Sequence, residues 1–175
     1  LLIVDRAFRV GDWVETSSVG EGIIEEVTLS TVKIRKFSKA IQTVPNGVIA
    51  AEPIINWSRA PNRRIKMDIG LVYGTSNEQF KTILVKLREF IASDDRVDHS
   101  VTQMVHMVGF GASSIDINVN YFTKTTDWEG FRSIVEEHML AFIEIVENAG
   151  SSMAFPTRTI HIEDGNIRQF YEGQE

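Results

Sequence analysis

The hydrophobic pattern of this chain changes period at residues 58–62, and this change constrains the fold more than any other feature. Before it, apolar residues alternate in short runs separated by turn residues, as β-strands do. After it, strand-like runs alternate with two segments whose apolar residues recur at helical spacing. The sequence therefore predicts two structural units, residues 8–60 and 61–164, preceded by residues 1–7 and followed by a tail at 165–175.

The first unit is expected to be a small β-barrel of the Sm or SH3-like kind, because closing short strands into a barrel removes their exposed edges. The predicted strands are 13–15, 23–27, 31–37, 40–44 and 54–57. A turn is expected at residues 20–22. Four further residues are expected to form turns, since Asn side chains bond nearby backbone groups and Gly and Pro favour turn geometry. They are Pro45, Asn46, Gly47 and Asn56.

The second unit is predicted to have the order β-α-β-β-α-β, the ferredoxin-like arrangement, which makes the whole chain α+β. Its predicted strands are 65–72, 101–108, 113–123 and 157–163. Each helix is expected to begin with a capping box, at Ser76–Gln79 and at Thr126–Glu129. The apolar residues expected on the buried helix faces are Phe80, Ile83, Leu84, Leu87 and Ile91, then Phe131, Val135, Met139, Phe142 and Val146.

The composition predicts a folded protein that does not bind nucleic acid. With 43% hydrophobic and 24% charged residues the chain resembles ordinary globular domains, and the absence of cysteine excludes disulfides and thiolate metal sites. The net charge of −6 comes entirely from residues 62–175, whereas a nucleic-acid-binding domain usually carries a basic face. No apolar run approaches the ~20 residues that span a bilayer.

No pattern in the sequence predicts catalysis, a cofactor or a metal ion. The four histidines lack the spacing of metal ligands, and His138 is expected to pack in the core. The glycines at 109 and 111 lie between two predicted strands, so they fit a hairpin better than a dinucleotide-binding loop. Arg59, Arg63 and Arg64 cluster at the unit boundary, where they are candidates for charges beside lipid headgroups or an ion path, or for a polar linker.

Motifs along nearly the whole chain resemble the cytoplasmic region of the small-conductance mechanosensitive channel (MscS) family. Each motif is short, but their order and spacing together are specific. They are FRVGDWV at 8–14, GIIEEV at 22–27, STVKIR at 30–35, PNG at 45–47, INWSR at 55–59, RR at 63–64 and IGLVY at 69–73. FTKTT at 122–126 and AFPT at 154–157 are similar to the larger bacterial paralogues within that family.

The resemblance implies a homo-heptamer in the bacterial inner membrane, with this segment on the cytoplasmic side as the vestibule of a tension-gated pore. Such a channel releases ions and small solutes on hypo-osmotic shock. Residues 1–7 would then be the end of the pore-lining helix, and Phe8, Arg9, Gly11 and Asp12 the hinge that couples it to the vestibule. The implied partners are further copies of the chain, permeating ions and, through membrane helices upstream, lipids.

Two other functions remain open from the residues alone. A ligand-binding regulatory module of a membrane protein is the main alternative, since ferredoxin-like domains often bind small molecules between subunits, and a fold does not fix function. It predicts saturable stabilisation of the protein by a metabolite. An enzyme is the third possibility, and it would need a catalytic constellation that the sequence does not show.

Overall fold

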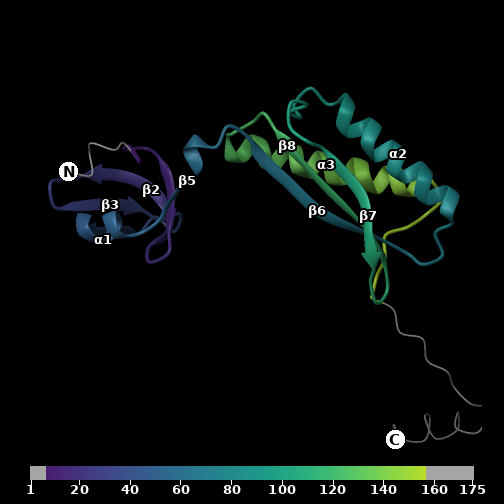
Figure 1. Ribbon diagram of the computed structural model, residues 1–175, viewed down its shortest axis with the longest axis horizontal. Coiled ribbons are helices and arrows are strands. Elements are labelled where there is room, and N and C mark those ends of the chain that lie inside the picture. Colours follow the sequence, from purple (N-terminus) through teal and green to yellow (C-terminus); the bar gives the residue numbers. More distant parts are fainter. Residues whose placement is uncertain (1–6, 157–175) are drawn as a thin grey trace, which may run out of the picture. The chain divides into compact units, whose positions relative to one another are not determined.

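The structure is a computed structural model that describes residues 7–156 and forms two units (Figure 1). By the contacts of the described residues, the first unit contains residues 7–63 together with Thr123–Arg132, and the second contains Arg64–Phe122 and residues 133–156. The sequence places residues 123–132 with the second unit, whereas their contacts group them with the first. The element order confirms the α+β class.

The first unit is built on a five-stranded antiparallel sheet in the order β4-β3-β2-β1-β5. The strands are β1 Trp13–Thr16, β2 Gly20–Val27, β3 Thr31–Arg35, β4 Ile41–Pro45 and β5 Ile54–Asn56. Alternate residues of these strands point into one apolar core, as the period-2 pattern predicts. Its fully buried members include Ile24, Val32 and Ile34, and Phe8 packs against them.

Glycine at position 22 is required by a close approach between strands. The predicted turn at residues 20–22 is wrong, because these residues are the first three of β2 and the chain turns at residues 17–19. A Cβ atom at Gly22 would lie 2.5 Å from a side-chain carbon of Ile34 and 2.9 Å from the carbonyl oxygen of Arg35. Only a residue without a side chain fits at this point of the β2–β3 pair.

At Pro45, Asn46 and Gly47 the structure differs from the predicted turn. Pro45 is the last residue of β4, and the short helix α1, Asn46–Ala51, begins directly after it. The fixed φ of Pro suits the residue before a helix, and Ile49 of α1 is buried in the core. The Asn46 side chain donates to the backbone carbonyls at 28 and 29, so it ties α1 to the β2–β3 turn.

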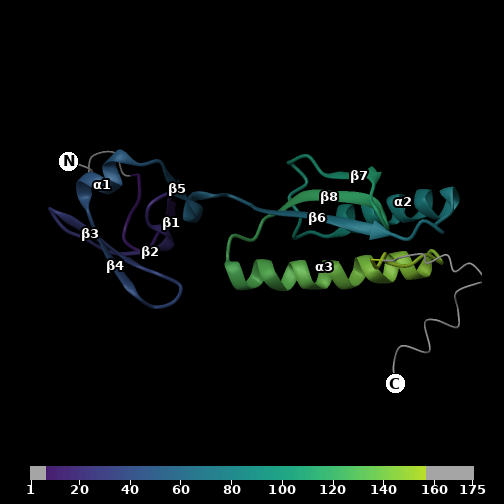
Figure 2. The same ribbon diagram turned by 90° about the horizontal axis from the view of Figure 1, so that it is seen from below.

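The second unit combines a three-stranded sheet, in the order β6-β8-β7, with two long helices. Its elements are β6 Arg63–Leu71, α2 Asn77–Ser93, β7 Met104–Phe110, β8 Ile115–Thr123 and α3 Trp128–Asn148. The end residues Arg63 and Thr123 and the first residues of α3, 128–132, are grouped with the first unit. Every second residue of β8 is buried on one face, and Phe90 of α2 meets Phe142 of α3 edge to face at 5.7 Å. α3 runs alongside the sheet in Figure 2. A single bridge joins Leu71 to Met153, and the predicted strand 157–163 lies outside the described residues.

The predicted helix starts are half right. The capping box of α2 is confirmed, with the Ser76 hydroxyl and the Gln79 side chain each bonding the other's backbone N–H. The cap of α3 is Asp127 rather than Thr126, since the Asp127 carboxylate accepts from the N–H of Gly130 at 2.7 Å. Among the described residues, no helix has the length and apolar character needed to cross a bilayer.

The buried stripe of α3 differs from the prediction at its centre. Met139 was expected inside but is 50% exposed, whereas His138 is completely buried, which confirms its predicted place in the core. The stripe runs through Phe131, Ile134, His138, Phe142 and Val146. A buried polar ring must find hydrogen-bond partners, and those that His138 finds define a polar network described below.

Candidate functional site

The predicted hinge is a tight turn whose backbone is bonded to the first unit. The N–H of Asp12 donates to the carbonyl of Arg9 at 3.0 Å, which closes a four-residue turn. Gly11 occupies its third position with a φ of +94°, a left-handed conformation that this turn geometry requires and glycine adopts without strain. The N–H of Gly11 also donates to the carbonyl of Ile24 at 2.8 Å. We call residues 8–12 the coupling segment.

The side chain of Asp12 holds the coupling segment to β5. Its carboxylate accepts from the N–H of Arg9 at 2.9 Å and from the amide of Asn56 at 2.8 Å. The same Asn56 amide donates to the carbonyl of Ala7 at 3.1 Å. The structure therefore brings Asn56, predicted only as a turn residue, together with the predicted hinge. Phe8 also packs against the core of the first unit. The coupling segment is therefore held to this unit by apolar packing as well as by hydrogen bonds.

The three arginines of the predicted cluster lie in different environments. Arg59 ends the short 3-10 helix Trp57–Arg59 and is exposed, and Arg64 is exposed on β6. Arg63 is only 8% exposed, and its Nε donates to the carbonyl of Thr126 at 3.1 Å. Arg63 is thus a buried packing residue in this chain. A place beside ions or headgroups remains a prediction for Arg59 and Arg64.

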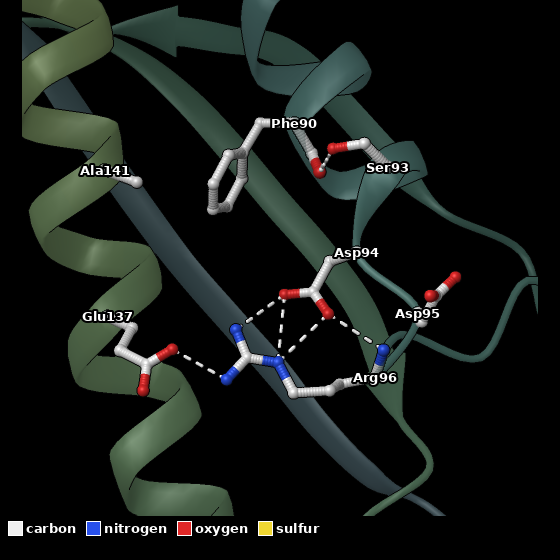
Figure 3. A pocket seen from close by; sticks show the side chains of 7 residues that line it. All are labelled: Phe90, Ser93, Asp94, Asp95, Arg96, Glu137 and Ala141. Atoms are coloured by element: carbon white, nitrogen blue, oxygen red, sulfur yellow. Dashed lines mark hydrogen bonds and ion pairs between the residues drawn. The ribbon is translucent and has the colours of Figure 1, made fainter.

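A surface pocket of about 550 Å³ lies in the second unit where α2 ends beside α3 (Figure 3). Arg96 bridges the two elements, since its guanidinium bonds the Asp94 carboxylate at 2.8 Å and the Glu137 carboxylate at 2.6 Å. Three of the charged groups in the pocket, Asp94, Arg96 and Glu137, are therefore bonded to one another. Within residues 7–156, no group of three or more His, Asp or Glu side chains is arranged to hold a metal ion.

Asp94, which lines this pocket, also belongs to a chain of hydrogen bonds that leads into the core. His138 Nε2 lies 2.8 Å from Asp94 Oδ2, and His138 Nδ1 lies 2.6 Å from the hydroxyl of Tyr121 on β8. Burial, with the charge of Asp94 as a second cause, raises the pKa of Tyr121. Because the Asp94 carboxylate only accepts, the ring hydrogen lies on Nε2, and in this tautomer Nδ1 accepts from the Tyr121 hydroxyl. The Nε2–H of His138 then donates to Asp94, which leaves the buried ring with both nitrogens bonded.

The charge of Asp94 should make the stability of the second unit depend on pH. Hydrogen bonds from Arg96 hold the pKa of Asp94 below its ordinary value, against the opposing effect of burial. A lowered folded-state pKa gives stability that is complete above the unfolded value of about 4 and is lost as the pH falls through the folded value. We therefore expect Asp94→Asn to destabilise the second unit by about 2 kcal/mol at pH 7, and by progressively less below about pH 4.

Urea unfolding followed by far-UV circular dichroism between pH 7 and pH 2.5 measures this difference. Tryptophan fluorescence supplies an internal control, because Trp13, Trp57 and Trp128 all belong to the first unit, whose transition should not change. A difference between wild type and Asp94→Asn that stayed constant over the whole pH range would contradict the prediction.

Sequence reasoning missed this network because nothing local links its members. Asp94 and His138 are 44 positions apart, and Asp94 reads as part of a polar loop that ends a helix. The one available signal was the histidine at a core position of a helical stripe, which requires partners from elsewhere in the fold.

Both units of the chain match families of known proteins. Residues 1–59 match the family model of the mechanosensitive ion channel beta-domain, and residues 65–153 match that of the C-terminal region of the mechanosensitive ion channel MscS. The chain belongs to the MscS family of mechanosensitive ion channels. The family predicted from the short motifs is confirmed.

Individual MscS proteins agree with this assignment. An uncharacterized MscS family protein of Aquifex aeolicus is 35% identical over 163 residues, covering 93% of this chain and 44% of the relative. The low conductance mechanosensitive channel YnaI of Escherichia coli is 32% identical, covering 94% of this chain and 48% of the relative. The chain thus spans about half the length of these curated relatives.

Solved MscS structures share the fold. The crystal structure of Helicobacter pylori MscS in its closed state superimposes with a TM-score of 0.77 at 24% identity, covering 93% of this chain and 62% of that one. At this level of identity the likeness establishes the fold alone. The two matched models meet between residues 59 and 65, which is where the periodicity of the sequence changes.

Proposed function

We propose that this chain forms the cytoplasmic vestibule of a tension-gated channel that releases ions and small solutes on hypo-osmotic shock. The observation that carries the proposal is the match of both parts of the chain, in order, to the beta-domain and the C-terminal region of mechanosensitive channels. The membrane-spanning helices would belong to a part of the channel outside this chain. The role is that of a conduit, without catalysis.

In the proposed assembly seven copies form a ring in the bacterial inner membrane, with this segment in the cytoplasm. Identical subunits that contact one another head to tail close into a ring and leave an open axis, which suits a conduit. Partners would be the other copies, the permeating ions, and lipids through the membrane helices. The bonded turn at residues 8–12 supports a coupling role, since a rigid connection passes on displacement better than a loose one.

Patch recordings of the full-length channel test the proposal. The channel is expressed in bacteria that lack their own mechanosensitive channels, and excised patches are recorded under graded suction. We expect unitary currents whose open probability rises with tension, and survival of the cells after a hypo-osmotic downshift. A protein that is abundant in the membrane yet gives neither current nor survival would refute the proposed function.

A further inference from the structure

Trp13 is the centre of an aromatic cluster in the first unit. Its ring lies 5.4 Å from that of Phe37 and 5.6 Å from that of Trp128, both edge to face, and 5.9 Å from that of Trp57. The backbone N–H of Trp13 donates to the Ser58 hydroxyl at 2.8 Å. Aromatic pairs at these distances and angles add to the stabilisation from burial alone.

The positively charged side chain of Arg63 lies over the Trp13 ring. The guanidinium carbon lies 4.7 Å from the centre of the Trp13 ring, within the range of a cation–π interaction. Because Arg63 is 8% exposed, this contact is shielded from water and stronger than one at the surface. The Nε of Arg63 also bonds the carbonyl of Thr126, so one side chain joins Trp13 to the segment Thr123–Arg132.

These contacts link two segments that are far apart in the sequence. Trp13 directly follows the coupling segment, and Trp128 is the first residue of α3. Asp12 and Trp13 are consecutive, so no flexible residue separates the coupling segment from the cluster. A displacement of the coupling segment would therefore reach Trp13 first, and then the residues that contact it or its partner, Arg63, Thr126 and Trp128.

We infer that Trp13 and Arg63 are positioning residues for gating: their contact passes movement of the coupling segment to the start of α3. The inference rests on the proposed function and adds two residues to the predicted hinge. A contact influences gating only if the closed and open states hold it to different extents. Weakening it should thus shift the tension at which the channel opens and leave the current through one open channel unchanged.

The test uses the full-length channel and a double-mutant cycle. Arg63→Met keeps most of the side-chain length but removes the charge. At fixed tension we expect the ratio of open to closed channels to change by at least about threefold, as the loss of one cation–π contact per subunit allows. Trp13→Leu, which also removes the ring contacts of Trp13, should shift the ratio in the same direction. Arg63→Met should then change the ratio less in the Trp13→Leu background than in wild type, because two residues that act through one contact are not additive. Arg63→Lys keeps a cation near the ring and should lie closer to wild type.

Arg88→Met is the matched control. Arg88 of α2 donates to the carbonyl of Val105 at 2.7 Å, so this variant removes the same charge and a similar hydrogen bond in the second unit. It should open at the wild-type tension. Arg63→Met channels that also open at the wild-type tension, or additive effects of Arg63→Met and Trp13→Leu, would overturn the inference.

The outcomes separate the two claims. A wild-type channel without tension-activated current refutes the proposed function. If the wild type does open under tension and Arg63→Met opens at the same tension, only the positioning role is refuted. If Arg63→Met or Trp13→Leu does not reach the membrane, Arg63→Gln or Trp13→Met, which likewise remove the charge or the ring, takes its place in the same cycle. A non-additive shift supports the inference, and the absence of a shift overturns it.

Discussion

Replacing His138 with alanine should lower the free energy of unfolding of the second unit by about 3–5 kcal/mol. The imidazole is fully buried, so its removal leaves a cavity, and it also leaves the Tyr121 hydroxyl without its acceptor and Asp94 without one of its donors. Phe90 and Phe142 lose their ring contacts with it as well. Urea unfolding followed by far-UV circular dichroism measures the effect, because the long helices α2 and α3 dominate that signal.

His106→Ala is the control for this prediction. It makes the same chemical change on β7, where the side chain is exposed, and should alter stability by less than about 0.5 kcal/mol. Tryptophan fluorescence, which follows the first unit, should stay unchanged for both variants. Equal effects of His138→Ala and His106→Ala would show that the buried network contributes nothing specific.

The elements that could be predicted are those set by neighbouring residues. Period-2 alternation located the strands of both units to within a few residues, and helical spacing located α2 and α3. The capping box at Ser76 was predictable because its two bonds join residues three apart. The hairpin predicted around residues 109–111 is confirmed, since β7 and β8 pair directly. Its turn lies at residues 111–114, because Gly109 and Phe110 are still paired in β7.

The errors have a common physical cause, which is that contacts across the fold overrode local preference. Gly20 and Gly22 suggest a turn, but the close approach of β2 and β3 requires a glycine in the strand itself. Met139 fits an apolar stripe by its chemistry, yet His138 takes the core position because Tyr121 and Asp94 satisfy its nitrogens. Hydrophobic periodicity along one helix cannot reveal hydrogen-bond partners that come from other elements of the fold.

The candidate functional residues were predictable only as members of a family motif. The resemblance predicts a hinge at Gly11 and Asp12, and the structure supplies the reasons for their residue types: a left-handed backbone at Gly11, and two donors that meet at the Asp12 carboxylate. Asn56 lies 44 positions from Asp12, so no local pattern could have joined them. The same holds for Arg63 and its place over Trp13.

Gly11→Pro should lower the stability of the first unit by about 2–4 kcal/mol and shift the opening tension of the full-length channel. Proline fixes φ near −65°, whereas Gly11 has a φ of +94°, so the turn at residues 9–12 cannot form as it stands. Proline also lacks the N–H that Gly11 donates to Ile24. Urea unfolding followed by tryptophan fluorescence gives the loss of stability, and patch recordings give the tension.

Two alanine variants distinguish the effect of backbone conformation from that of steric clashes with an added Cβ atom. A Cβ atom would meet nothing within 4 Å at either Gly11 or Gly47, but only Gly11 has a left-handed backbone. Gly11→Ala should therefore cost about 1–2 kcal/mol, whereas Gly47→Ala, inside α1, should leave the first unit equally or slightly more stable. Gating should follow the same order, with Gly11→Pro most altered and Gly47→Ala unaltered. If Gly11→Pro channels open at the wild-type tension although the turn is lost, the coupling segment does not control opening, and its bonds to β2 and β5 serve the fold alone.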